Sequence, residues 1–149
     1  MCIRDSGGSV EICALRGTGV IRAVRARVSS DQRYAWRKLV LRGEWDGAGR
    51  PQVLTPLGPF FGFDWDTAEY GSVVAGCRDG LAYQFFPMPF RKSAVLTLEN
   101  HLEAPASVRI EIEWAPLTRL PDDAVYFYAR WRTEPDLSLI HISEPTRPY

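Results

Sequence analysis

Residues that commonly bind metals are scarce in this sequence. Its 149 residues include 3 cysteines and 2 histidines. A structural zinc site needs about four Cys, His or carboxylate ligands at short spacings. Cys13 and Cys77 lie far apart, and neither has a neighbouring histidine. The sequence therefore predicts no metal site and no cofactor. The two thiols are expected to be small buried side chains, and a disulfide between them stays an alternative.

An excess of charge of one sign is also missing. The 18 Lys and Arg residues balance the 18 Asp and Glu residues, so the formal net charge is zero. A nucleic-acid surface needs a basic excess, so we expect no nucleic-acid partner. No apolar run approaches the roughly 18 residues that a membrane helix requires, so we also expect no membrane partner.

The sequence pattern at the two ends of the chain differs from that of its middle. The chain opens with MCIRDS and closes with LSLIHISEPTRPY. One possible DNA sequence encoding the opening segment can be read on its complementary strand. That strand translates to Leu-Ser-Leu-Ile-His, which is the beginning of the closing segment. Inverted copies of one DNA word at both ends are typical of a sequencing adapter joined to an insert. We interpret residues 1–6 and 137–149 as adapter-derived, and residues 7–136 as part of a longer protein.

Apolar and polar residues alternate through most of the middle. Within residues 20–28, Arg25 and Arg27 share one face and valine and alanine occupy the other, a period typical of a half-buried strand. One short helix is expected at residues 31–38, with Ser30 as its N-cap. Asp46-Gly47 and Asp79-Gly80 predict tight turns. Further strands are expected at residues 38–45, 81–86, 94–100, 107–114 and 124–132. The pattern predicts an all-β sandwich or barrel.

The segment FFPMPF, residues 85–90, interrupts this pattern. Pro87 and Pro89 have no amide hydrogen to donate, so the segment cannot be the middle of a central strand. We expect an extended edge, or a crossing between sheets, anchored in the core by its phenylalanines and methionine.

Two of the predicted strands carry candidate catalytic carboxylates. Glu99 ends one strand, and Glu111 and Glu113 share a face of the next. The linker between them is short, so we expect antiparallel neighbours with Glu99 opposite or diagonal to Glu113 or Glu111. Side chains directly opposite lie about 4.5–5.5 Å apart at Cβ. Retaining glycoside hydrolysis uses two carboxyl groups about 5–5.5 Å apart. A solvated polar face is the alternative interpretation.

Several stretches resemble one known family. In order, GTGVIRAVRARV, LVLRGEWDG, PQVLTPLGPFFGF, FFPMPFRKSAVLTLEN and LPDDAVYFYARWR are similar to the family catalogued as domain of unknown function 2961, now glycoside hydrolase family 172. The resemblance implies a β-jelly roll, usually two per chain, assembled as a homo-oligomer such as a trimer or hexamer. It also implies retaining cleavage of α-linked fructofuranosides or arabinofuranosides without a required metal.

The resemblance also suggests which residues form the site. It implies that Glu99 is the nucleophile-type glutamate and Glu113 the acid/base, with Glu111 as the alternative. The residues implied to bind the carbohydrate substrate are Phe61, Asp64, Trp65 and Arg91. Core packing is the alternative role of Phe61. Pro59 stands where many members have an acidic residue, which bears on the substrate contacts.

Together these observations predict an incomplete jelly-roll sandwich in residues 7–136. We expect the parent protein to be a retaining glycoside hydrolase acting on α-linked furanosides, and the isolated chain to be inactive. The alternative is a non-catalytic jelly-roll module that binds carbohydrate or serves assembly.

Overall fold

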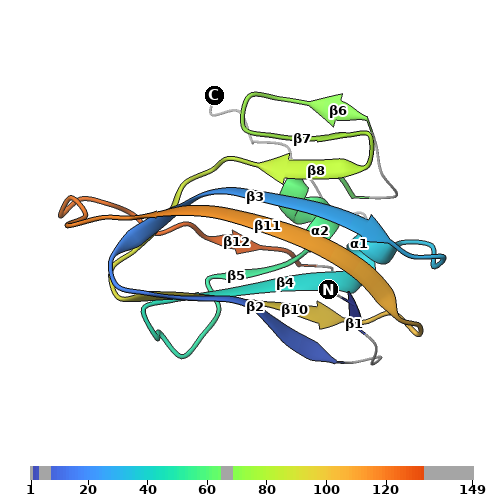
Figure 1. Ribbon diagram of the computed structural model, residues 1–149, viewed down its shortest axis with the longest axis horizontal. Coiled ribbons are helices and arrows are strands. Elements are labelled where there is room, and N and C mark those ends of the chain that lie inside the picture. Colours follow the sequence, from blue (N-terminus) through green and yellow to red (C-terminus); the bar gives the residue numbers. More distant parts are fainter. Residues whose placement is uncertain (1, 4–7, 65–68, 133–149) are drawn as a thin grey trace, which may run out of the picture.

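Strands with apolar residues at every second position form two sheets that pack face to face (Figure 1). The computed structural model describes residues 2–3, 8–64 and 69–132. Sheet A has the strand order β1-β11-β3-β8-β7-β6, and β9 also pairs with β3. Sheet B has the order β12-β5-β4-β10-β2. All neighbours are antiparallel except β12 and β5, which are parallel. The fold is a β-sandwich.

The described elements follow one another with short connections. In chain order they are β1 (Cys2–Ile3), β2 (Ser9–Arg16), β3 (Gly19–Ser29), α1 (Ala35–Lys38), β4 (Leu39–Trp45), β5 (Val53–Pro56), α2 (Leu57–Phe61), β6 (Tyr70–Gly71), β7 (Ala75–Arg78), β8 (Leu81–Gln84), β9 (Met88–Phe90), β10 (Ser93–Asn100), β11 (Ala106–Pro116) and β12 (Ala129–Arg130). Neither described helix has the length or apolar character to span a bilayer.

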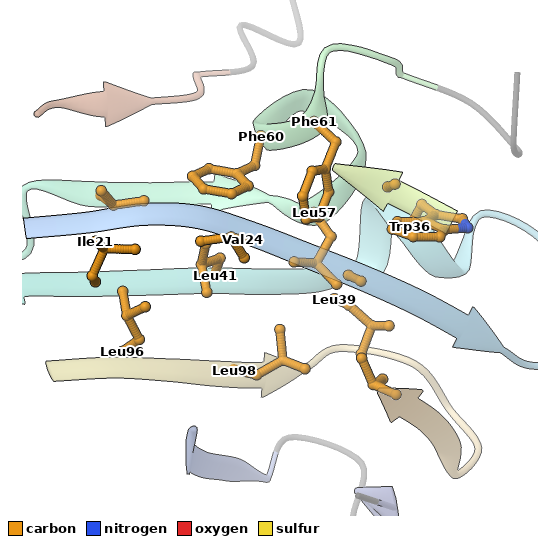
Figure 2. Packing of buried hydrophobic residues seen from close by; sticks show 14 of the residues in the cluster. Ile21, Val24, Trp36, Leu39, Leu41, Leu57, Phe60, Phe61, Leu96 and Leu98 are labelled. Atoms are coloured by element: carbon orange, nitrogen blue, oxygen red, sulfur yellow. The ribbon is translucent and has the colours of Figure 1, made fainter. Parts of the chain in front are cut away.

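The hydrophobic core lies between the two sheets. Figure 2 shows Ile21 and Val24 of sheet A close to Leu41 and Leu96 of sheet B, and all four are at most 2% exposed. Leu98, two residues further along β10, is also fully buried. Because side chains alternate along a strand, the residues between these core positions face outward from the sandwich. The candidate glutamates all occupy such outward positions.

Four predicted strands are confirmed, and two are shorter than predicted. Residues 20–28, 38–45, 94–100 and 107–114 correspond to β3, β4, β10 and β11. The strand predicted at 81–86 ends at Gln84. The strand predicted at 124–132 is formed only at Ala129–Arg130, where the chain pairs with β5. Before that point Phe127 packs its ring against Phe60 and Phe86. Strands β1, β2, β5, β6 and β7 were not predicted, and β1 lies in the segment interpreted as adapter-derived.

The predicted helix is also shorter than expected. It begins at Ala35, after Tyr34, whose φ of 62° is left-handed. Ser30 does not cap it, because its hydroxyl accepts a hydrogen bond from the amide of Gln32 at 3.2 Å, in the turn before the helix. Both predicted turns are confirmed, at Asp46-Gly47 and Asp79-Gly80.

The proline-rich segment is an edge of sheet A, as predicted. Strand β9 pairs with the start of β3, and the next residues lead into β10 of sheet B. Met88 and Phe90 are buried, as expected of core anchors. Phe85 and Phe86 are 39% and 43% exposed, so the prediction that they anchor the core is wrong. Strand β8 ends before them, and Phe86 stacks on Phe127 at the surface.

Candidate functional site

The two predicted catalytic strands belong to different sheets. Strand β10 pairs with β2 and β4, whereas β11 pairs with β1 and β3. Glu99 lies opposite Ser9 and Val40, and Glu113 lies opposite Ala23. The prediction that Glu99 lies across from Glu113 or Glu111 is therefore wrong.

A turn centred on Asn100 explains why the short linker does not form a hairpin. The Asn100 side chain accepts a hydrogen bond from the amide of Leu102 at 3.0 Å and donates one to the carbonyl of Ala104 at 3.4 Å. Leu102 is fully buried. The linker therefore runs across the end of the sandwich, with only Leu102 inserted into the core, and carries the chain from sheet B to sheet A.

The candidate glutamates point away from each other. Glu99 occupies an outward position of sheet B, and Glu113 occupies one of sheet A. Packed sheets lie roughly 10 Å apart, so outward side chains on opposite faces are farther apart than that. Retaining hydrolysis needs about 5–5.5 Å between carboxyl groups, and inverting hydrolysis about 6.5–9.5 Å. A single copy of the described sandwich therefore does not bring Glu99 and Glu113 together for either reaction.

The immediate partner of Glu99 is a histidine. The Glu99 carboxylate lies 3.2 Å from Nε2 of His101, and their side chains are 30% and 56% exposed. The amide of His101 donates to the carbonyl of Lys38 at 2.9 Å, which fixes the chain after β10 against the end of α1. A carboxylate held by a histidine while open to solvent can act as a nucleophile or a base. This contact between His101 and Glu99 was not predicted from the sequence.

Helix α1 brings the predicted substrate loop to the same end of sheet B. Its Trp36 ring packs edge-on against Phe61, with ring centroids 6.1 Å apart. Its Arg37 lies 3.8 Å from the Asp64 carboxylate. The other oxygen of that carboxylate, Oδ1, is buried and has no hydrogen-bond partner in the described structure. The sequence offered no sign of this role for Arg37, because a four-residue helix has no clear periodicity.

The predicted substrate-binding residues do not all lie at this end. Phe61 is fully buried, so its ring is a core side chain here. Trp65 lies outside the described residues. Arg91 precedes β10, whereas Glu99 is near its end. The six-residue rise from Ser93 to Glu99 is about 20 Å.

At that opposite end, Arg91 belongs to a cluster of hydrogen bonds centred on the Asp46 carboxylate, the Asp46 clamp. Its guanidinium donates to the carbonyl of Pro121 at 3.1 Å. Its amide donates to the Asp46 carboxylate at 2.9 Å. That carboxylate also accepts hydrogen bonds from the amides of Lys92 and Ser93 and from the hydroxyl of Tyr126. This arrangement fixes the connection between the two sheets.

Glu113 and Glu111 lie in a surface rich in arginine. Glu113 is 3.4 Å from Arg25, and Glu111 is 2.9 Å from Arg109. Arg25, Arg109 and Glu111 line a cleft of about 280 Å³ on the outer face of sheet A, together with Arg27 and Leu81. No group of three or more potential metal ligands occurs among the residues that the structure describes.

The cysteines do not act together. Cys77 is buried and Cys13 is partly buried, and both are free thiols. Burial raises the pKa of each thiol, with a further rise from Glu11 at Cys13 and from Glu69 at Cys77. A raised pKa disfavours the reactive thiolate.

Comparison with family models identifies a family for this chain. A family model described as GH172 domain-like matches residues 2–112. The matched segment includes Glu99, Asp64 and Glu111, and it ends one residue before Glu113. No curated protein matches the chain.

Proposed function

Because the chain belongs to the GH172 domain-like family, we propose that it supplies the β-sandwich, of jelly-roll type, of a retaining glycoside hydrolase. The proposed substrates are α-linked furanosides, either fructofuranosides or arabinofuranosides. The family match supports this proposal because it covers most of the described sandwich, including both the strand that carries Glu99 and the loop that carries Asp64.

In this proposal Glu99 is the nucleophile. Its carboxylate is open to solvent yet held by His101 at 3.2 Å, so it is both accessible and oriented. Asp64 would hydrogen-bond sugar hydroxyl groups through the accessible part of its carboxylate, since its side chain is 46% exposed. The Arg37 guanidinium at 3.8 Å holds the Asp64 side chain in place.

The acid/base of the proposed reaction is Glu113 of a second copy of the chain. Glu99 and Glu113 lie on opposite outer faces of one sandwich. They can approach to about 5–5.5 Å only where sheet A of one copy meets sheet B of another. Such a head-to-tail contact gives a ring where the rotation between copies closes, and we propose a ring of this kind, such as the trimer or hexamer expected from the sequence.

The test is complementation between two inactive variants of the full-length protein. We expect Glu99→Gln and Glu113→Gln each to lose activity by at least about 100-fold, as for a general acid or base. Dissociating and reassembling a 1:1 mixture should restore about one quarter of wild-type turnover, because random assembly into a closed ring pairs an intact Glu99 with an intact Glu113 at that frequency. Glu11→Gln is the control, since Glu11 is exposed on the neighbouring strand β2.

Failure of complementation would separate the two parts of the proposal. If each variant is inactive but the mixture stays inactive, Glu113 is not the partner across an interface. If Glu99→Gln keeps full turnover, the catalytic role of Glu99 is wrong.

The position of the glutamates on opposite faces also favours a second candidate function. In that case the sandwich is a non-catalytic module that binds carbohydrate or serves assembly. It predicts no turnover of aryl α-furanosides by the full-length protein, together with sugar binding or oligomer formation that Glu99→Gln leaves unchanged.

A further inference from the structure

Two arginines face each other across the outer surface of sheet A. Arg27 of β3 lies directly opposite Arg109 of β11 in the strand register. Like charges directly opposite on one face of a sheet destabilise it. The next pair along, Arg25 and Glu111, has opposite charges. Repulsion between Arg27 and Arg109 therefore destabilises the sheet at this position, and a bound anion could offset that repulsion.

The neighbouring glutamates neutralise only part of this charge. Arg109 pairs with Glu111 at 2.9 Å, and Arg25 pairs with Glu113 at 3.4 Å. Arg27 donates to the backbone carbonyl of Asp79 at 2.6 Å. In the described part of the chain, Arg27 has no carboxylate within ion-pair distance. One cation therefore remains uncompensated at this surface.

Three arginines line a cleft, and its remaining lining residues are Glu111, which is paired with Arg109, and Leu81. The cleft, of about 280 Å³, is formed by Arg25, Arg27, Arg109, Glu111 and Leu81. Ligand pockets range upward from about 300 Å³, so this cleft lies just below that range and has room for one small ligand at most. Leu81 and Tyr83 project from the same face of β8, because they are two residues apart on one strand.

An aromatic surface adjoins the cleft. The Tyr83 and Phe85 rings stack with centroids 5.1 Å apart, and the Arg25 guanidinium lies 5.5 Å from the centre of the Phe85 ring. A side chain at Gly76 would overlap the Tyr83 ring, so this glycine lets the ring lie flat across β7. Flat aromatic faces suit the apolar face of a sugar ring.

We propose that this cleft binds a monosaccharide bearing a carboxylate, that is, a uronic acid. The planar guanidinium of Arg27 matches a carboxylate in two parallel hydrogen bonds, and Arg109 supplies the second positive charge. Leu81 would contact the sugar ring, and the Tyr83 and Phe85 rings border the cleft beside Arg25. This site goes beyond the proposed catalytic function. It lies on the face of the sandwich opposite Glu99. Arg109, at its far side, is about 13 Å along β11 from Glu113 by strand rise, whereas Arg25, at its near side, pairs with Glu113 at 3.4 Å.

The experiment is a calorimetric titration of the full chain with D-glucuronate, methyl D-glucoside and inorganic phosphate. We expect glucuronate to bind at least tenfold more tightly than either comparison ligand. We expect Arg27→Gln and Arg109→Gln each to weaken its binding about 10–100-fold, the effect of losing a hydrogen bond to a charged group. Arg22→Gln is the control, because Arg22 is exposed on β3 outside the cleft.

Three results would overturn the proposal. Equal binding of glucuronate and methyl glucoside would show that the carboxylate is not recognised. Equal binding of phosphate would reduce the cleft to a general anion site. Unchanged glucuronate binding by both cleft variants would place the ligand elsewhere. Because the readout is binding, these outcomes are independent of whether Glu99 is catalytic.

Discussion

Replacing Asp46 by asparagine is expected to weaken the fold by about 2 kcal/mol at neutral pH. The Asp46 carboxylate accepts hydrogen bonds from the amides of Arg91, Lys92 and Ser93, at 2.9, 2.6 and 3.0 Å, and from the hydroxyl of Tyr126. Asparagine keeps one oxygen and tolerates the left-handed φ of 59°. Its NH₂ group is a donor, so it cannot accept the bonds made to the second oxygen. We therefore expect the loss of about one charge-assisted hydrogen bond, worth roughly 1.5–3 kcal/mol.

The size of this effect should depend on pH. Burial acts to raise the pKa of Asp46, but the hydrogen bonds from Tyr126 and the three amides outweigh it, so the pKa is lowered. A carboxyl group with a lowered pKa stabilises the folded state above its unfolded pKa, about 3.9, and loses that contribution as pH falls through its folded value. The difference between wild type and Asp46→Asn should stay constant from about pH 5 to 7 and shrink below about pH 4.

Urea unfolding followed by tryptophan fluorescence measures this difference at each pH. Asp79→Asn is a matched control, because Asp79 also precedes a glycine in a tight turn, with φ 50°. Its carboxylate makes no hydrogen bond within the described structure, so we expect a change below about 0.5 kcal/mol. Two results would refute the stabilising role of the Asp46 clamp. One is an equal loss of unfolding free energy in the two variants at pH 7, and the other is an Asp46→Asn loss that stays unchanged at pH 3.

Two further predictions concern the core and the limits of the chain. Leu98→Ala should destabilise the protein by about 2–5 kcal/mol in urea unfolding, because Leu98 is fully buried. The outward Thr97→Ala on the same strand should cost less than about 1 kcal/mol. Sequencing the source DNA outward from within residues 19–131 should show the reading frame continuing into different sequence beyond residues 6 and 136. Genomic DNA that encodes both end segments would contradict the adapter interpretation.

The alternation of residues predicted the faces of the strands well. In β4 and β10 the period of two identifies the residues that face the core, because the period depends only on local geometry. In β3 and β11 it does so only up to the register shift between Glu113 and Trp114, after which Trp114 is 39% exposed. The short strand at Ala129–Arg130 depends instead on pairing with β5, which is distant in the sequence. Such pairing leaves no local pattern, so the extent of this strand could not be predicted.

The sequence predicted only part of the arginine cleft. Alternation placed Arg25 and Arg27 on one face of a strand and Arg109 on a face of another. Which of these residues meet depends on strand order and register. A register shifted by one residue would turn one set of side chains to the opposite face. The like-charged pair therefore emerges only from the fold.

The linker between β10 and β11 decides the arrangement of the candidate catalytic residues, and its sequence contained a usable signal. A short linker allows either a hairpin or a crossing between sheets. Hairpin loops lie at the surface and favour polar residues, whereas Leu102 is apolar and fully buried. An apolar residue in the middle of this linker therefore favours a crossing between sheets that is anchored by that residue. With a crossing, Glu99 and Glu113 must lie on opposite outer faces, so any reaction that uses both must draw one of them from a second copy of the chain.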